Sequence, residues 1–170
     1  MTHIIEMLST NMNKLVNETN YYKQRIQYLE NENKNILSVL ENTPNSMGYI
    51  FDKWSLNPID CKFSYCSPVS QIIYELLPEK IIENPMTIIN QILPEYVDNF
   101  VKSVDVSYET LNNWNWTGGI KTPSGKIKFI KCQSKPYLDN TKEGKYVKWH
   151  GAVLDVTETH NSNLEYEKLI

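Results

Sequence analysis

Glycine and proline are scarce in this sequence, and neither occurs in its first 43 residues. The chain holds 6 glycines and 8 prolines among 170 residues, fewer than the roughly 12% that these two types usually contribute. This scarcity excludes collagen-like chains and low-complexity chains rich in glycine and proline. All of these residues lie between Pro44 and Gly151, so a segment without helix breakers precedes a segment with turns.

Long apolar runs and export signals are also missing. No stretch of about 20 apolar residues occurs, so we expect no membrane-spanning helix, and the N-terminus lacks the basic start and apolar centre of a signal peptide. The three cysteines, Cys61, Cys66 and Cys132, are an odd number in a chain without such a signal. We therefore expect reduced thiols and a cytoplasmic location.

Arginine is nearly absent, since Arg25 is the only one among 17 basic residues, and the net charge is −3. Bidentate recognition of phosphate or guanine depends on arginine, so the composition argues against a nucleic-acid partner. The sequence has no C-x-x-C or H-x-x-x-H metal spacing, no G-x-S-x-G motif and no phosphate-cradling loop. We therefore predict no metal ligand and no catalytic residue, as in a regulatory domain rather than an enzyme.

The first 43 residues have the periodicity of a coiled coil. From Ile5, alternating steps of three and four residues reach eleven positions, nine of them apolar, and such a seam is the surface on which coiled-coil helices pack. We predict a dimerisation helix over residues 1–43. The predicted interface residues are Ile5, Leu8, Met12, Leu15, Tyr22, Ile26, Leu29, Asn33, Ile36 and Leu40.

Polar positions in and beside this seam favour a parallel homodimer. Asn33 occupies an a position, where a buried asparagine fixes the register and favours two parallel strands. Opposite charges face each other across such a dimer at Glu18 with Lys23 and at Arg25 with Glu30, although each pair contributes little. The alternative is an amphipathic helix that packs on the chain's own domain, which would usually show a wider apolar stripe.

From residue 44 the pattern changes to short elements separated by turn residues. Pro44 disfavours a helical residue before it, so the long helix is expected to end there. Residues 47–52 and 61–66 are predicted strands, and Ser67 with Pro68 is typical of an N-cap followed by the first residue of a helix. Further helices are expected over 79–83, 86–92 and 94–111, the last opened by a proline.

The last third of the chain is predicted to form sheet. Trp114 and Trp116 lie two residues apart and share one face of a strand, and the pair Gly118–Gly119 indicates a turn or a bulge. Residues 126–134 form the next strand, and its alternation slips at Phe129. This slip indicates either a bulge or a strand that is covered on both faces.

A polar loop over 138–144 then leads to a last strand over 145–156. Residues 158–170 are expected to be helical, with Asp155 or Thr157 as the cap. Strands on both sides of a run of helices predict an α+β domain built on an antiparallel sheet.

The end of the last strand resembles PAS domains of bacterial sensor kinases. In that family a W-x-G-x-x-x-D-[IV]-T run marks the last strand and its exit, and here the matching residues are Trp149, Gly151, Asp155, Val156 and Thr157. The preceding block WNWTGGIKTPSGKIKFIKCQSKP is similar as well, and ILPEYVDNFVKSV matches the family's helix start in part. The resemblance covers about residues 41–158.

The resemblance implies a PAS fold over residues 44–158, with a five-stranded antiparallel sheet and short flanking helices. The coiled-coil helix over 1–43 precedes it, and residues 159–170 begin an exit helix. Such domains often bind a small ligand between the sheet and the helix that here begins near Pro94. The candidate pocket residues are Phe100, Val104, Trp116 and Cys132, and the residues expected to couple strand to exit helix are Trp149, Gly151, Asp155 and Thr157.

Cofactor motifs of the family do not occur in the sequence. Its haem sensors place an axial histidine on the helix before the third strand, and residues 94–111 contain none. Its light sensors carry a reactive cysteine in a G-x-N-C-R-F-L-Q-like motif, which has no counterpart here. We therefore predict no cofactor, while an unidentified small ligand and non-covalent flavin stay open.

Three functions are compatible with these observations. The first is a regulatory sensory domain that passes a signal through its flanking helices to an output domain, a kinase or a cyclase, outside this chain. The second is a constitutive dimerisation scaffold without a ligand, and the third is a redox or gas sensor that holds flavin or haem. A cavity near the candidate pocket residues favours a sensor, whereas an interior filled by side chains favours a scaffold.

Overall fold

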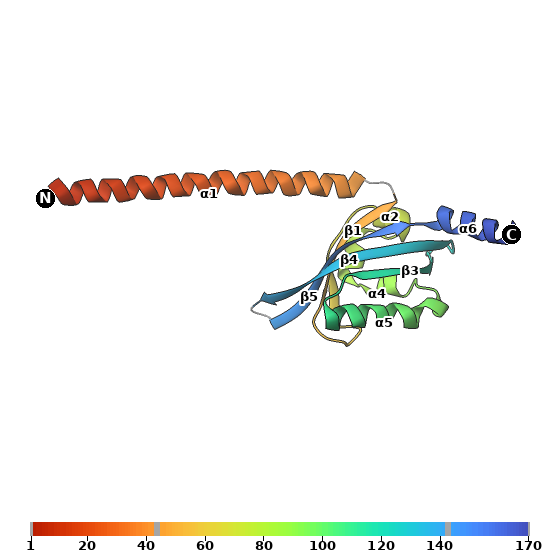
Figure 1. Ribbon diagram of the computed structural model, residues 1–170. Helices are drawn as coiled ribbons and strands as arrows, with labels where there is room; N and C mark the ends of the chain where they lie inside the picture. The colour runs from red at the N-terminus through yellow and green to blue at the C-terminus, as the bar shows by residue number, and fades with distance from the viewer. Residues whose placement is uncertain (1, 43–44, 142–143, 170) are drawn as a thin grey trace. The chain divides into compact units, whose positions relative to one another are not determined.

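The computed structural model describes residues 2–42, 45–141 and 144–169 (Figure 1). The chain divides into two compact units, Met1–Val39 and Leu40–Ile170. Within the described ranges, no helix combines the length and the apolar character that crossing a membrane requires.

One helix of 41 residues, α1 (Thr2–Asn42), forms the first unit and continues past its boundary at Val39, as the absence of glycine and proline predicts. The seam side chains from Ile5 to Ile36 are exposed, from 41% of the surface at Leu29 to 67% at Met12. The helix is therefore confirmed, and its partner stays a prediction. The expected end at Pro44 and the side chain of Leu40 lie outside the described residues.

The second unit is built on a five-stranded antiparallel sheet in the order β2-β1-β5-β4-β3. The backbone N–H of Asp155 donates to the carbonyl of Asn45 (2.9 Å), because the last strand lies beside the first. The chain thus enters and leaves the domain at adjacent points. The strands are β1 (Ser46–Lys53), β2 (Cys61–Cys66), β3 (Trp114–Lys121), β4 (Ile127–Thr141) and β5 (Gly144–Asp155).

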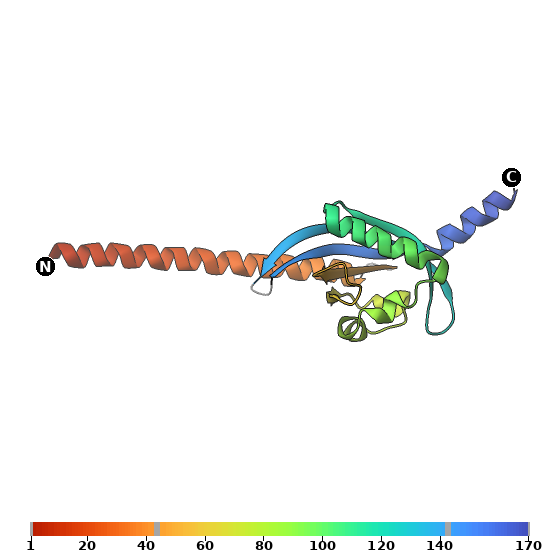
Figure 2. The same cartoon turned by 90° about the horizontal axis from the view of Figure 1, so that it is seen from below.

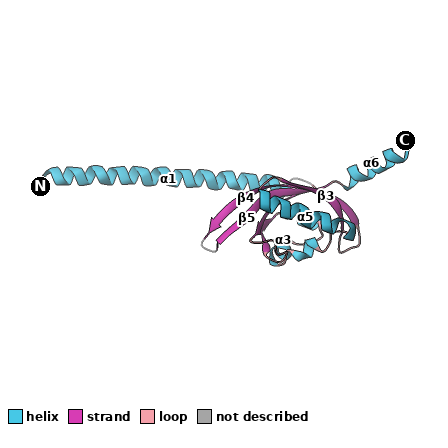
Figure 3. Ribbon diagram, turned by 60° about the horizontal axis from the view of Figure 1, so that its bottom comes forward, coloured by secondary structure: helices cyan, strands magenta, loops and turns pink. Residues whose placement is uncertain are grey.

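Four helices between β2 and β3 pack on one face of the sheet, which we call the inner face (Figures 2 and 3). α3 contacts β2, and α5 contacts β3. Met47, Ile73, Ile81 and Ile120 have no exposed surface and belong to one core between these layers. The helices are α2 (Ser70–Ile73), α3 (Pro78–Glu83), α4 (Met86–Ile89) and α5 (Pro94–Thr110), and α6 (Thr157–Leu169) follows β5.

The start of α2 differs from the prediction. The hydroxyl of Ser67 accepts a hydrogen bond from the N–H of Gly48 (3.1 Å), and the N–H of Ser67 donates to the carbonyl of Gly48 (2.9 Å). Ser67 therefore joins the end of β2 to β1, and α2 begins only at Ser70. The predicted N-cap at Ser67 with Pro68 as the first helical residue is wrong, because the serine side chain binds a distant backbone group instead of the next turn.

The hairpin of β4 and β5 is longer than predicted. The predicted loop over 138–144 is wrong at its described positions, because strand pairing continues to Thr141 and Gly144. Residues 142–143 lie outside the described residues. Past Ser134, β4 pairs with β5 but no longer with β3, so Pro136 lies where one side of the strand needs no ladder hydrogen bond. A polar composition therefore belongs to an exposed extension of the strands and not to a loop.

The pair Gly118–Gly119 lies within β3 in regular register with Ile130 and Phe129, so the predicted turn or bulge is wrong. A Cβ atom on Gly119 would lie 2.6 Å from the side chain of Leu93, so the glycine lets the segment before α5 approach the sheet closely. Of the two explanations for Phe129, the bulge is wrong, because the register is regular. The outer face of β4 is exposed at later positions such as Lys131, and α6 covers it at Phe129. The ring of Phe129 stacks on His160 of α6 with centroids 3.5 Å apart.

Candidate functional site

An apolar cavity of about 110 Å³ lies between the inner face of the sheet and the helices α4 and α5. Every strand of the sheet contributes to its wall. The alternation of side chains along each strand explains the lining, because every second residue points to the inner face. Lining residues include Met47, Phe51, Phe63, Trp116, Ile130, Cys132, Trp149 and Val153 from the sheet and Ile88, Phe100 and Val104 from the helical side.

The four predicted pocket residues all line this cavity. Phe100 and Val104 lie one turn apart on α5 and so share a helix face, while Trp116 and Cys132 are cross-strand partners on β3 and β4. The helix is placed by Pro94 at its first turn and ends at Leu111, which adopts a left-handed conformation (φ 57°). The structure thus brings the four residues together from three elements.

Aromatic rings form the wall between α5 and β3. The ring of Phe100 meets Trp114 and Trp116 edge-on, with centroids 5.6 and 5.0 Å apart, and Tyr96 meets Trp116 in the same way at 6.4 Å. Edge-to-face pairs of this kind stabilise by about 0.5–1.5 kcal/mol beyond burial alone. This side of the cavity therefore presents aromatic surface to an occupant.

Two of the three buried indole N–H groups have serine acceptors on α5. The N–H of Trp114 donates to the hydroxyl of Ser103 (2.8 Å), and the N–H of Trp149 donates to the hydroxyl of Ser107 (3.0 Å). The indole nitrogen of Trp116 is buried and has no hydrogen-bond partner among the described residues. Leaving a buried donor of this kind without an acceptor is energetically costly.

Ser103 and Ser107 are not among the site residues predicted from the sequence. Each hydroxyl also donates to a backbone carbonyl, that of Phe100 (2.7 Å) or Asn112 (2.8 Å), so neither serine is free to bind a ligand. The available signal was their spacing of four residues on the apolar face of a predicted helix, opposite a strand rich in tryptophan. That spacing places both hydroxyls on one face of α5.

Gly151 leaves space for the ring of Tyr49 to pack against the backbone of β5. It pairs with Tyr49 on β1 and Ser134 on β4, and a Cβ atom here would lie 2.4 Å from the carbonyl oxygen of Gln133 and 2.9 Å from the Tyr49 ring. The ring therefore lies across β5 where only glycine fits. Burial raises the pKa of Tyr49 above its ordinary range, so its phenol stays protonated and available as a donor.

The buried thiols of Cys66 and Cys132 stay protonated at neutral pH and are therefore poor nucleophiles. Burial raises the pKa of Cys132 far above its ordinary value and that of Cys66 to about 11, so both remain thiols at neutral pH and act as small apolar side chains. The described residues hold no group of three or more histidines, cysteines and acids able to bind a metal.

The residues of this site do not fit haem or flavin. None of the three histidines lines the cavity: His3 is on α1, His150 is exposed on β5, and His160 stacks on Phe129. An axial ligand for haem iron is therefore missing from the wall. A cavity of about 110 Å³ is also smaller than the ~300–1,000 Å³ of pockets for drug-sized ligands, so a ligand about the size of one ring fits better than a tricyclic flavin.

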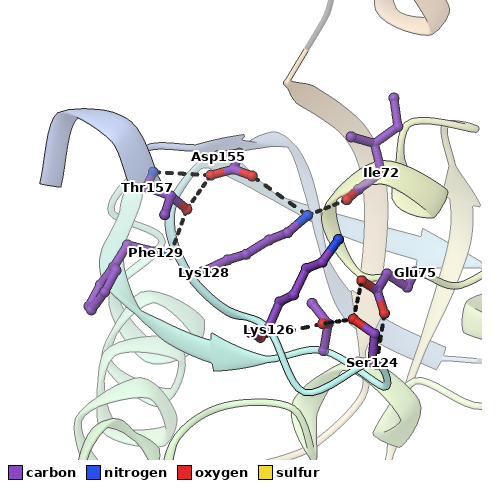
Figure 4. A network of polar contacts seen from close by, with 9 residues as sticks. Ile72, Glu75, Ser124, Lys126, Lys128, Phe129, Asp155 and Thr157 are labelled. Carbon is purple, nitrogen blue, oxygen red and sulfur yellow. Dashed lines mark hydrogen bonds and ion pairs between the residues drawn. The ribbon is translucent and has the colours of Figure 1, made fainter. Parts of the chain in front are cut away.

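A second polar site joins the exit helix to the sheet (Figure 4). The hydroxyl of Thr157 accepts from the N–H of Phe129 (3.0 Å) and donates to the carboxylate of Asp155 (2.5 Å), which also accepts from the N–H of Thr157 (3.0 Å). Of the two candidate caps, Asp155 is therefore the one that satisfies a free N–H at the helix start. We call Phe129, Asp155 and Thr157 the exit junction.

Lys128 extends the exit junction to the helical layer. Its ammonium lies 3.8 Å from the second oxygen of Asp155 and donates to the carbonyl of Ile72 in α2. Both partners of this ion pair are mostly buried, with 15% and 17% of their side chains exposed. The start of α6 is thus held by β4, β5 and α2 together.

The turn between β3 and β4 is fixed by a separate contact to Glu75, in the segment that follows α2. The carboxylate of Glu75 accepts from the N–H and from the hydroxyl of Ser124 (2.9 and 2.7 Å). These hydrogen bonds lower the pKa of Glu75 below its usual value. This contact holds the end of β4 that carries Lys128 and Phe129.

The sequence matches no family model and no curated protein, but the fold has clear counterparts among solved structures. A sensory box histidine kinase/response regulator from Burkholderia thailandensis matches 72% of this chain and 89% of its own, at a TM-score of 0.52 and 18% identity. A PAS domain from Colwellia psychrerythraea matches 74% and 97%, at a TM-score of 0.55 and 14% identity.

A third counterpart is the N-terminal domain of a diguanylate cyclase with a PAS/PAC sensor from Marinobacter aquaeolei. It matches 68% of this chain and 98% of its own, at a TM-score of 0.51 and 11% identity. The chain therefore has the PAS fold, and the predicted α+β class with a five-stranded antiparallel sheet is confirmed.

Ser107→Ala is expected to lower the free energy of unfolding by about 1–3 kcal/mol, because it leaves the buried N–H of Trp149 without an acceptor. Ser103→Ala is expected to have an effect of similar size through Trp114. The control Ser162→Ala, on the exposed surface of α6, should change the free energy by less than about 0.5 kcal/mol. Urea unfolding measures all three, and unchanged midpoints for both α5 variants would contradict the assigned roles.

Proposed function

We propose that this chain is a sensory domain in which a small ligand in the cavity changes the position of the exit helix. The observation that carries the proposal is the short distance along the chain between the two sites. On β4, Ile130 lines the cavity and the residue directly before it, Phe129, belongs to the exit junction. On β5, Val153 lines the cavity two residues before Asp155.

The cavity itself supports a ligand over a scaffold without one. A pure scaffold would fill its interior, since protein cores are close-packed, whereas here all five strands border unfilled space. The unpaired N–H of Trp116 adds a polar group that an occupant with a hydrogen-bond acceptor would satisfy. The predicted residues Phe100, Val104 and Cys132 would form the apolar part of such a site.

The exit junction supplies the route for transmission. An occupant that shifts β4 or β5 moves either the donor or the acceptor of the Thr157 hydroxyl, and the first turn of α6 must follow or lose these hydrogen bonds. Small shifts at packed interfaces are amplified in this way when the interface has discrete arrangements. Trp149 contributes from the middle of β5, since its indole links the strand to α5 through Ser107.

The seam of α1 supports a parallel homodimer as the state in which the domain works. Its exposed apolar side chains need a partner, and a second copy of the same helix offers the matching spacing and charge pairs. Two helices entering and two leaving would carry a change at the exit junctions to an output domain. Solved structures with this fold come from a histidine kinase and a diguanylate cyclase, so we propose an output domain of one of these types, in the cytoplasm.

Light scattering on the 170-residue chain is expected to give twice the mass of one chain at tens of micromolar. Tyr22→Lys, on the seam, should shift the mass toward one chain, because a charge at a d position opposes packing. Its neighbour Tyr21 has a similar exposure (64% against 62%) but lies off the seam, so Tyr21→Lys is a matched control that should remain dimeric. A wild-type chain of monomeric mass would overturn the dimer.

Val104→Met is expected to change hydrogen exchange in the first turn of α6, because the longer side chain occupies part of the cavity and displaces the adjoining strands. The same substitution in a Thr157→Val background should have no such effect, since the exit junction is then cut. Val106→Met on the exposed side of α5 (48% exposed) is the control. Hydrogen exchange is measured by mass spectrometry on five chains: wild type, Val104→Met, Val106→Met, Thr157→Val and the double variant Val104→Met/Thr157→Val.

Two results would refute this route. Exchange in α6 that is identical in wild type and Val104→Met, with exchange near the cavity altered, would show that the cavity and the exit helix are independent. An equal response with and without the Thr157 hydroxyl would show that transmission does not use the exit junction.

A further inference from the structure

A lysine occupies the inner face of the sheet. Along β1 the residues that face the helices are Met47, Tyr49, Phe51 and then Lys53, which is 4% exposed and lines the cavity. It lies on an inner strand, paired with Cys61 of β2 and Val147 of β5. Lysine is almost never buried to this degree without a charged partner. The groups around Lys53 therefore indicate whether its charge is already paired.

The described residues give Lys53 no such partner. Its ammonium donates to the carbonyl of Asn57 (3.2 Å), and no carboxylate oxygen among them lies within 4.0 Å of it. The adjacent Asp52 points to the opposite face, where it accepts from Ser64 and pairs with Lys148 (3.7 Å). At least part of the donor capacity of Lys53 is therefore left for another acceptor.

The positive charge of Lys53 acts on a neighbouring residue of the cavity wall, Cys61. Burial raises the pKa of the neighbouring Cys61 thiol, and the charge of Lys53 acts against that rise. The remaining wall is apolar and aromatic, with Asp105 on α5 as the one carboxylate among the described lining residues. An unpaired cation beside apolar surface favours an occupant that carries an anionic group on an apolar body.

We propose that the ligand of this cavity is a small apolar monocarboxylate whose carboxylate binds the ammonium of Lys53 and whose body fills the cavity. This inference rests on the proposed sensory function and names its ligand class. The volume of about 110 Å³ sets the size of the body, since a cavity of about 150 Å³ holds one benzene ring. The half-buried carboxylate of Asp105 weakens this binding by repulsion and disfavours dicarboxylates.

Benzoate and benzamide are the matched probes, because they share one ring and differ in charge. Calorimetric titration of the 170-residue chain is expected to show benzoate binding at least about tenfold more tightly than benzamide, as a charge-assisted hydrogen bond predicts. Lys53→Met should weaken benzoate binding by about the same factor and leave benzamide within about threefold. Asp105→Asn should tighten benzoate binding, because it removes the like charge.

Lys131→Met, a substitution at an exposed residue of β4, is the control for the loss of one positive charge and should leave benzoate binding unchanged. Folding of Lys53→Met is checked by its unfolding midpoint, and removal of an unpaired buried charge is expected to leave it equal or higher. These controls separate loss of the site from loss of the fold.

Equal affinity for the two probes, binding of neither probe, or unchanged benzoate binding in Lys53→Met would each overturn the monocarboxylate class. Weaker benzoate binding in Asp105→Asn would also overturn it and point to a zwitterionic ligand. The sensory function fails separately, through the α6 exchange response to Val104→Met. If benzoate binds through Lys53 but the chain lacks that exchange response, the proposed ligand site is supported and the proposed sensory function is refuted.

Discussion

The hydroxyl of Thr157 holds three elements together, because it accepts from the backbone of Phe129 on β4 and donates to Asp155 at the end of β5 while it stands in the first turn of α6. The same carboxylate accepts the free N–H at the start of the helix, and its second oxygen faces Lys128. A cap of this kind stabilises a helix start by about 1 kcal/mol. Removing it therefore alters the attachment of α6 more than the stability of the core.

The cavity depends on the same strands for its shape. Trp114 and Trp149 are anchored to serines of α5, so two of the three buried indoles fix the distance between helix and sheet. Trp116 and Lys53 carry donors that the described protein residues leave partly or wholly unpaired. The indole N–H groups that have serine acceptors thus fix the spacing of helix and sheet. The donors of Trp116 and Lys53 that lack full pairing are the groups to which an occupant would bind.

Periodicity and a single motif were enough to predict most of the fold. The helix without breakers, the strand order along the chain and the W-x-G-x-x-x-D-V-T run follow from local residue patterns, and they led to the PAS fold that solved structures share. The resemblance places a ligand between the sheet and the helix that begins near Pro94, and the residues predicted there, Phe100, Val104, Trp116 and Cys132, line the cavity.

The remaining features depend on contacts between distant segments, which one sequence does not display. Ser67 looks like a helix cap and instead binds Gly48 on β1. Lys53 follows directly after the predicted strand over 47–52, and the alternation from Met47 onward places residue 53 on the inner face. The acceptors Ser103 and Ser107 carry information only once their tryptophan partners are known.

A double-mutant cycle tests most directly whether the cavity wall and the exit junction act as one unit. Ile130→Val shortens a cavity-lining residue that is 2% exposed, and Thr157→Val removes the hydroxyl that binds the neighbouring backbone. The unfolding free energies of this pair should be non-additive by at least about 0.5 kcal/mol, while Ile81→Val in α3 paired with Thr157→Val should be additive. Additivity within about 0.3 kcal/mol for both pairs would contradict the account.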